Sequence, residues 1–255
     1  MSWSGFKKNL NRAGTTIMQK AGAMEKTVDR EFEEEERRFR LLESKSERLH
    51  KEAKGYLDSL RSVTNAQKRI AETISQFYDD SAPMGVCVTR YKQTMDSLED
   101  VARLEMDQTY RQTVLEPIGR FCAYFPEIND AIKKRNKKLL DYDSMRNKVR
   151  KLVDKPSEDT SRLPRAEQDA NMAREIYEHL NSLLIAELPK VVDIRVPYLD
   201  PSFEAMVKTQ LQYYQSAHQK LGVVREYFPP EEPTLESKVE GVLQQMRDLT
   251  ICGIN

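Results

Sequence analysis

The segment from Glu25 to Asp80 most constrains the fold, because it contains one glycine and no proline. Its apolar residues recur mainly at spacings of three, four and seven, the period of an α-helix that packs along one side. They are Val28, Phe32, Phe39, Leu42, Leu49, Ala53, Tyr56, Leu60, Val63, Ile70, Ile74 and Phe77. At 1.5 Å per residue, about 55 helical residues extend roughly 80 Å. The segment therefore predicts one long helix of a coiled coil or an extended bundle.

Composition agrees with an all-α protein. Nine glycines, an aromatic share of 8% and a charged share of 32% favour long helices over sheets. The 41 basic residues balance the 41 acidic ones. A chain without net charge is unlike a dedicated nucleic-acid binder, so any cationic site has to be local.

A second helical stretch runs from about Val88 to Asp154 and includes two prolines. Pro117 and Pro126 each remove a backbone donor and clash with the carbonyl four residues earlier. We therefore expect bends near Thr113 and Cys122. Pro126 could instead end one helix and begin another, and the sequence leaves both alternatives open.

The third helical stretch follows a polar turn at 154–165 and begins near Pro164, because proline is favoured in a first turn. Its apolar pattern continues to Leu188 and is then expected to be interrupted by Pro189, Pro197 and Pro201, and the sequence leaves open whether these prolines kink or break the helix. The pattern resumes at 203–227, and a short last helix is expected at 235–249. The sequence thus predicts three long helices with two accessory ones.

Three helices of this length carry more apolar surface than one subunit can bury. Two subunits that overlap lengthwise would bury the stripes in an antiparallel six-helix bundle. The turn at 154–165 would then lie exposed at each far end, and bent helices would make the bundle an arc.

A local cationic face is predicted between Ile128 and Val153. With Ile132 at 0°, the rotation of about 100° per residue places four lysines between about 100° and 240°, away from the apolar stripe. They are Lys133, Lys134, Lys137 and Lys138. No acidic residue interrupts 131–140. Such a face can be simply solvated, but its single sign favours a binding surface. Lys151, Lys155, Arg162 and Arg165 surround the following turn and are further candidates.

The N-terminal segment contains no acidic residue before Glu25. Its apolar edge consists of Trp3, Phe6, Leu10, Ala13, Ile17 and Ala21, and its cations are Lys7, Lys8, Arg12 and Lys20. This pattern indicates an interfacial helix that inserts into a membrane, in preference to a transit peptide or a helix docked on its own core. Because of Gly5 and Gly14, we expect it to be poorly helical until it binds an apolar surface.

The sequence offers no catalytic constellation. His50, His179 and His218 stand alone, no cysteine pair has metal-ligand spacing, and no glycine-rich phosphate loop occurs. We therefore expect neither an enzyme nor a cofactor. The odd number of cysteines and the absence of a secretory signal favour a soluble protein of a reducing compartment. Cys252 is the fourth residue from the end, where prenylation occurs, but the residues after it do not fit that signal, so we expect an unmodified thiol.

The chain resembles BAR domain proteins of the amphiphysin type, and most closely the short fungal members (the reduced-viability-upon-starvation family) that hold little beyond the BAR domain. The matching pieces are WSGFKK at 3–8, KEAKGYLDSLR at 51–61, LEPI at 115–118, AIKKR at 131–135, LDYD at 140–143, LPRAE at 163–167, RVPY at 195–198 and DPSFEA at 200–205. They follow one another along nearly the whole chain.

This resemblance implies a crescent-shaped dimer that binds anionic membranes with its concave face and tips and inserts its N-terminal helix into the leaflet. It implies a membrane-inserting helix at 1–24, a BAR domain at 25–228 and a tail helix at 229–255. It also implies action in endocytosis and cortical actin organisation, in the cytoplasm at the cell cortex. Longer relatives carry a Src-homology-3 domain, for which 229–255 is too short, so the partner is either a second copy or a longer BAR protein. A coiled-coil tether without lipid binding remains the alternative, and nucleic acid is not expected as a partner.

Overall fold

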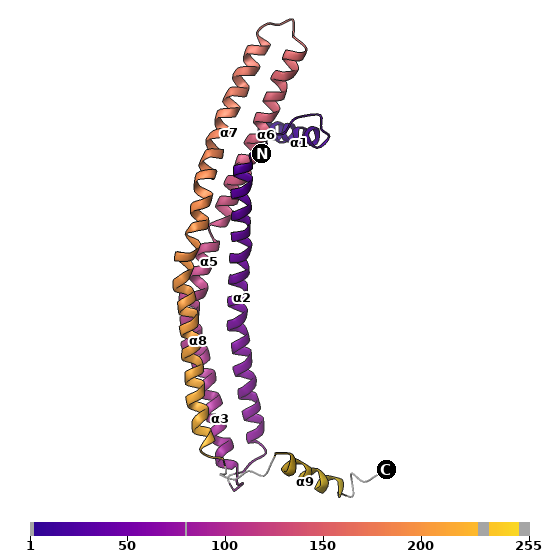
Figure 1. Ribbon diagram of the computed structural model, residues 1–255. Helices are drawn as coiled ribbons and strands as arrows, with labels where there is room; N and C mark the ends of the chain where they lie inside the picture. The colour runs from indigo at the N-terminus through magenta and orange to yellow at the C-terminus, as the bar shows by residue number, and fades with distance from the viewer. Residues whose placement is uncertain (1–2, 80, 229–234, 250–255) are drawn as a thin grey trace. The chain divides into compact units, whose positions relative to one another are not determined.

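The computed structural model describes residues 3–79, 81–228 and 235–249, with side chains from residue 8 in the first helix and from residue 239 in the last (Figure 1). Within these ranges the chain is all-helical, which confirms the predicted fold class. The elements are α1 (Trp3–Lys20), α2 (Arg30–Ser75), α3 (Gly85–Asp100), η1 (Val101–Met106), α4 (Asp107–Tyr110), η2 (Arg111–Leu115), α5 (Glu116–Cys122), α6 (Phe125–Asp154), α7 (Arg162–Asp193), α8 (Arg195–Arg225) and α9 (Leu235–Arg247).

The second predicted helix is a series of shorter ones. Where a bend was expected near Thr113, the structure has η2, a π-helical stretch directly before Pro117 in the first turn of α5. A wider turn accommodates the proline ring that would clash in a regular α-helix. At Pro126 one helix ends and another begins: α5 ends at Cys122, and Pro126 lies in the first turn of α6.

The expectation that three prolines interrupt the third stretch is wrong in detail. Pro189 and Pro201 lie inside α7 and α8. The helices part only at Ile194, and Pro197 occupies the first turn of α8, where its missing donor costs nothing. Leu188 and Val192 on either side of Pro189 are buried, and this packing holds the helix through the proline.

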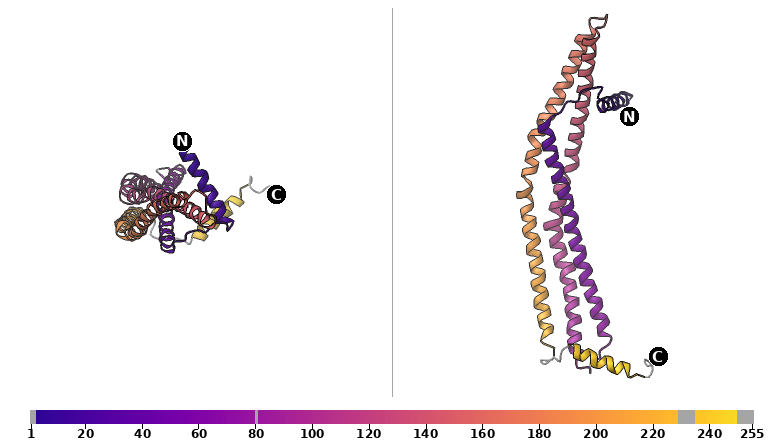
Figure 2. Two further views of the ribbon diagram at one scale, coloured as in Figure 1. Left: turned by 90° about the horizontal axis from the view of Figure 1, so that it is seen from above. Right: turned by 45° about the vertical axis from the view of Figure 1, so that its right-hand side comes forward.

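The chain divides into two compact units. The first comprises residues 1–56 and 109–207, and in it α6 and α7 run side by side over much of their length (Figures 1 and 2). Its core joins the start of α2 to α5, α6 and α7. The buried members are Phe32, Phe39, Leu42, Phe121, Phe125, Ile132, Leu184, Leu188 and Val192.

The second unit comprises residues 57–108 and 208–255. Its small core contains Ala71, Met95 and Leu98, with Tyr91 and Ala217 packed against them. Polar contacts fasten its helices at the surface. The Lys68 ammonium lies 3.4 Å from an Asp96 carboxylate oxygen, and the Lys220 Nζ donates to the Ser97 Oγ at 2.6 Å.

None of the helices in the described part of the chain is long and apolar enough to cross a membrane. The thiol of Cys252, for which an unmodified state was predicted, lies outside the described residues. The side chains of Trp3, Phe6 and Lys7 also lie outside them.

Candidate functional site

The predicted cationic face lies on the exposed side of α6. Ile132 and Leu139 are buried, and Ile132 belongs to the core of the first unit. The opposite side of the helix therefore faces solvent. Lys133, Lys134 and Lys137 are exposed, whereas Lys138 is half-buried. Three of the four lysines thus lie on the open surface, as predicted, and Lys138 lies at its border.

Most of these lysines keep their charge unneutralised. The Lys133 ammonium pairs with Asp130 at 3.0 Å, an exposed contact between residues three apart. Among the ion pairs formed by the described residues, none involves Lys134, Lys137 or Lys138. Exposed pairs such as Lys133 with Asp130 contribute little and break easily. The face can therefore present all of its ammonium groups to an anionic partner.

Arg135, within the same basic run, has a different role. It lies three residues after Ile132 and four before Leu139, so its side chain points into the bundle and is 5% exposed. Its guanidinium donates to the Asn181 Oδ1 at 2.8 and 2.6 Å and to the Tyr177 hydroxyl at 3.1 Å. Burial lowers the pKa of Arg135, while Tyr177 and Asp29 oppose that shift. This cation stabilises the bundle and is not part of the open face.

The turn between α6 and α7 carries the second predicted cluster. Lys151, Lys155, Arg162 and Arg165 are all exposed there. Asp159 orders the turn by accepting hydrogen bonds from the Ser161 backbone N–H at 3.0 Å and its hydroxyl at 2.7 Å. These bonds lower the pKa of the Asp159 carboxyl. Asp154, Glu158 and Asp159 lie among the cations, so the turn is less strongly positive than the face on α6.

Helix α1 is docked on α6, although sequence analysis ranked such docking behind membrane insertion. The Arg12 guanidinium donates to both carboxylate oxygens of Asp141, at 2.8 Å each. The Gln19 amide donates to Asp143 at 2.7 Å. These anchors explain why α1 is helical without an apolar surface, contrary to our expectation from Gly5 and Gly14. An isolated helix of 18 residues is marginal, and tertiary contacts stabilise it.

The predicted apolar edge of α1 does not take part in this docking. Among its described side chains, Leu10, Ala13 and Ile17 are exposed, as is Lys8 on the polar side. Thr15 is the buried residue of the helix. The helix thus faces its own chain with polar groups and offers its apolar edge outward.

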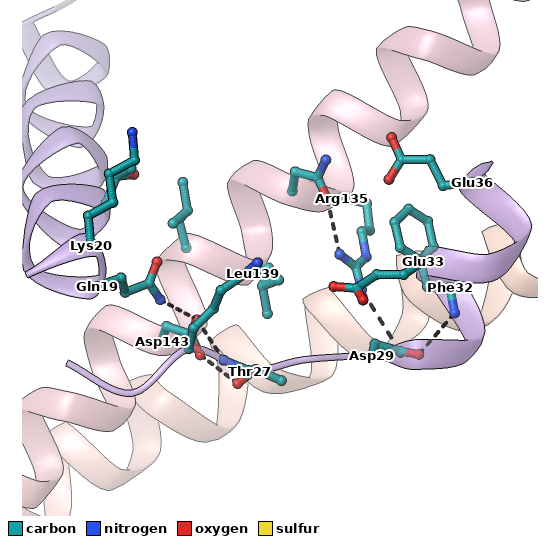
Figure 3. A pocket seen from close by; sticks show the side chains of 14 residues that line it. Gln19, Lys20, Thr27, Asp29, Phe32, Glu33, Glu36, Arg135, Leu139 and Asp143 are labelled. Atoms are coloured by element: carbon teal, nitrogen blue, oxygen red, sulfur yellow. Dashed lines mark hydrogen bonds and ion pairs between the residues drawn. The ribbon is translucent and has the colours of Figure 1, made fainter. Parts of the chain in front are cut away.

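A pocket of about 460 Å³ lies where α1, the start of α2 and α6 meet (Figure 3). Gln19 and Thr27 point to Asp143 on one side, and Asp29 and Arg135 meet on the other. Its charged lining residues are Lys20, Lys26, Asp29, Glu33, Glu36, Arg135 and Asp143. Residues of both signs are thus mixed along this seam between α1, α2 and α6.

Sequence analysis missed Asp141 and Asp143. Both belong to the segment LDYD at 140–143. Asp143 is only 1% exposed. A carboxylate is almost never buried to this extent unless it has a partner. A signal was available: Asp141 and Asp143 are the first carboxylates after the lysines of 133–138, and an acid-free N-terminal segment needs carboxylate partners.

The fold and the exposed cations define a bundle of long helices with a cationic surface and an amphipathic helix docked on α6. The chain belongs to the BAR domain family, whose model matches residues 6–228. BAR domains bind and curve membranes, and they dimerise. They are structural scaffold proteins.

Similar proteins cover the whole chain. It is 54% identical over 261 residues to protein hob3 of Schizosaccharomyces pombe, with 100% of this chain and 99% of that protein covered. It is 45% identical to the reduced viability upon starvation protein 161 of Saccharomyces cerevisiae, with the same coverage. Human amphiphysin is 29% identical over 209 residues, which cover 82% of this chain and 29% of amphiphysin.

Two solved structures share the fold. A BAR protein from Galdieria sulphuraria matches with a TM-score of 0.65 and 20% identity, over 80% of this chain and all of that chain. The amphiphysin BAR domain from Drosophila matches with a TM-score of 0.58 and 20% identity, over 88% of this chain and 97% of that chain. At this level of identity the match concerns the fold alone.

Proposed function

We propose that this protein binds anionic membrane surfaces through the lysines of α6, inserts the apolar edge of α1 into the leaflet and thereby senses or generates curvature. The turn cations Lys155, Arg162 and Arg165, together with Lys151, add a second contact. The observation that carries the proposal is the exposed, mostly unpaired lysine face on a family member whose relatives bind membranes.

The ammonium group of lysine is well suited to binding anionic lipid head groups. Lipid head groups are mobile and present no fixed hydrogen-bond geometry, so compact, flexible ammonium groups suffice. Each cation near an anionic leaflet contributes about 1 kcal/mol. Four on each of two subunits give an upper value of about 8 kcal/mol before screening and the loss of motional freedom. Such binding is reversible.

We further propose that the protein works as a dimer, in endocytosis and cortical actin organisation at the cytoplasmic face of the cell cortex. A relative from Candida albicans is named regulator of cytoskeleton and endocytosis. Helix α8 supports dimerisation because it leaves a long apolar row exposed, at Phe203, Val207, Leu211, Tyr214 and Leu221. The partner is a second copy or a longer BAR protein with a Src-homology-3 domain, and actin-regulating proteins act with the dimer.

Light scattering tests the dimer. We expect twice the mass of the chain at micromolar concentration, and Leu211→Glu with Tyr214→Glu should shift the protein toward the monomer because two charges enter the apolar row. A well-folded wild-type monomer at that concentration would contradict dimerisation between like chains. If the chain then co-purifies with a longer BAR protein, the dimer consists of two unlike chains.

Charge reversal tests the membrane site. We expect the quadruple variant Lys133→Glu, Lys134→Glu, Lys137→Glu and Lys138→Glu to stay folded and dimeric, because these side chains lie outside the buried core. Its sedimentation with phosphatidylserine vesicles should fall to background, since attraction becomes repulsion. The matched control replaces the same four residues by arginine, keeps the charge and should sediment like the wild type.

Salt provides an independent check. Between about 0.05 and about 0.5 M salt the screening length shrinks from about 14 to about 4 Å, so wild-type sedimentation should decline. A folded quadruple glutamate variant that still sediments like the wild type would move the membrane site from α6 to the turn cations. A wild type that does not bind vesicles at all would favour the coiled-coil tether.

A further inference from the structure

Two interruptions of the long helices lie next to each other in the first unit. One is η2, the π-helical stretch that precedes Pro117 in the first turn of α5. The other is the boundary at Ile194, where α7 ends and α8 begins, and α5 lies beside this boundary (Figure 1). The Tyr198 hydroxyl, in the first turn of α8, donates to the Pro117 backbone carbonyl at 3.1 Å. One side chain thus joins the two places at which these helices depart from regular geometry.

Each interruption contains a proline. Pro117 has no N–H group to donate to the carbonyl of Thr113 in η2, and Pro197 has none to donate to the carbonyl of Asp193 at the end of α7. A missing hydrogen bond leaves the following turn free to tilt, so a proline alone does not fix the direction in which the chain continues. A contact from a neighbouring element has to fix it.

The Tyr198 ring holds the same turn of α5 at a second point. It stacks on Phe121, with ring centroids 5.1 Å apart and ring planes inclined by 28°. Phe121 is 4% exposed and meets Phe125 edge-on at 5.3 Å, across the boundary between α5 and α6. Phe125 in turn meets Phe39 of α2 at 5.8 Å. This aromatic row of Tyr198, Phe121, Phe125 and Phe39 connects α8 through α5 and α6 to α2.

We propose that Tyr198 is a positioning residue that sets the angle between the helix segments at this junction, and thereby the membrane curvature that the protein binds best. This inference rests on the proposed membrane binding. The lysines of α6 act on the lipid directly, whereas Tyr198 acts through the direction of the helix that carries them.

The place of the junction makes a small change of angle effective. Helix α6 has 30 residues and is about 45 Å long, and Lys133 follows Phe125 by about 12 Å along it. A tilt of about 10° at the first turn of α6 moves its far end by about 8 Å. This displacement equals the screening length of about 8 Å at physiological salt. It therefore decides whether the lysines of α6 and the turn cations reach a leaflet of given radius together.

Binding to vesicles of two sizes tests the proposal. For the full-length chain we would measure the lipid needed for half-saturation with small and with large phosphatidylserine vesicles, and take the ratio of the two values. Tyr198→Phe keeps the ring stack and loses the hydrogen bond, so the ratio should move toward one by about 2- to 10-fold. Tyr198→Ala loses both contacts and should move it further. An unchanged ratio in both folded variants, or a wild type that binds both sizes equally, would overturn the proposal.

The matched control is Tyr124→Phe. Tyr124 lies between α5 and α6 and is 65% exposed, so this variant removes the same hydroxyl from the same part of the bundle. Its ratio should equal that of the wild type. Thermal unfolding of all variants separates position from stability. If Tyr198→Ala unfolds at a lower temperature but keeps the wild-type ratio, Tyr198 only stabilises the bundle and the proposal is wrong.

A distance across the junction gives a readout without lipid. We would place spin labels at Arg150→Cys on α6 and Asp200→Cys on α8, both exposed, in a full-length chain whose three cysteines are replaced by alanine. Dilution with unlabelled chain restricts the measurement to pairs within one chain. The wild type should give one narrow distance distribution, and Tyr198→Ala a broader or displaced one.

The same narrow distribution in Tyr198→Ala would show that the angle is set elsewhere and would overturn the proposal. The vesicle data separate its failure from that of the proposed function. Unchanged ratios on a wild type that binds vesicles contradict the curvature role of Tyr198 alone. A wild type that binds vesicles of neither size contradicts the proposed membrane binding and the curvature role with it.

Discussion

The Arg135 guanidinium lies 3.7 Å from the centroid of the Phe32 ring, so a buried cation of α6 is stacked on the first turn of α2. The same guanidinium bonds to Asn181 of α7. Asp29 completes the cluster by accepting from the Asn181 amide at 2.5 Å and from the Phe32 backbone N–H at 3.0 Å. One arginine of α6 thus links this helix to α2 and α7.

Arg135→Ala should lower the free energy of unfolding by about 3 kcal/mol, because Asn181 and Tyr177 lose a charged donor and Asp29 loses its nearby cation inside the bundle. Lys134→Ala, the exposed neighbour, should change it by less than about 0.5 kcal/mol. Urea unfolding at one fixed protein concentration measures both. Equal values for the two variants would contradict the stabilising role of Arg135.

Tyr110→Phe should raise the free energy of unfolding by about 1 kcal/mol. The Tyr110 hydroxyl is buried and has no hydrogen-bond partner among the described residues, so the folded state bears a desolvation cost that phenylalanine avoids. The ring itself packs against Tyr56, with centroids 5.7 Å apart, and is retained in the variant. Thermal unfolding of wild type and variant side by side makes the comparison, and a loss of stability would indicate that the hydroxyl has a partner after all.

Alkaline pH should destabilise the wild type. Burial raises the pKa of Tyr110, Tyr177 and Tyr213 above the ordinary value near 10. Above pH 10 the unfolded chain therefore releases protons that the folded chain retains, and stability falls as pH rises through the raised values. Each tyrosine contributes a slope of at most about 1.4 kcal/mol per pH unit. Urea midpoints between about pH 8 and pH 11 should stay level and then decline, and the decline should be shallower in Tyr110→Phe.

Ile17→Glu should weaken membrane binding without disturbing the fold. The side chain is 68% exposed on the apolar edge of α1, so the folded protein loses little. If α1 inserts as proposed, a carboxylate at this place has to enter the leaflet and faces an anionic surface. The matched control is Asn11→Glu, which puts the same charge on an exposed position of the same helix outside the apolar edge. If both variants bind vesicles equally, the apolar edge does not insert.

Much of the fold could be predicted because helical periodicity is a local property. The buried positions Phe32, Phe39 and Ile132 all belong to stripes that were recognised from their spacing. The same rotation that exposed Lys134 and Lys137 would also have placed Arg135 inside. The buried position of Arg135 was not predicted, because arginine is rarely buried and its partner Asn181 is distant in the sequence.

Local sequence patterns are sufficient to specify the helices, the departure from a regular α-helix before Pro117 and the side of α6 on which its lysines gather, since each follows from residues within a few turns of one another. Tertiary structure decided whether Pro189 and Pro201 would break their helices, because packing of distant residues outweighs one missing hydrogen bond. It also decided where α1 goes. The contacts of Arg12 with Asp141 and of Gln19 with Asp143 join residues more than a hundred positions apart, and no local pattern encodes which carboxylate a cation will meet.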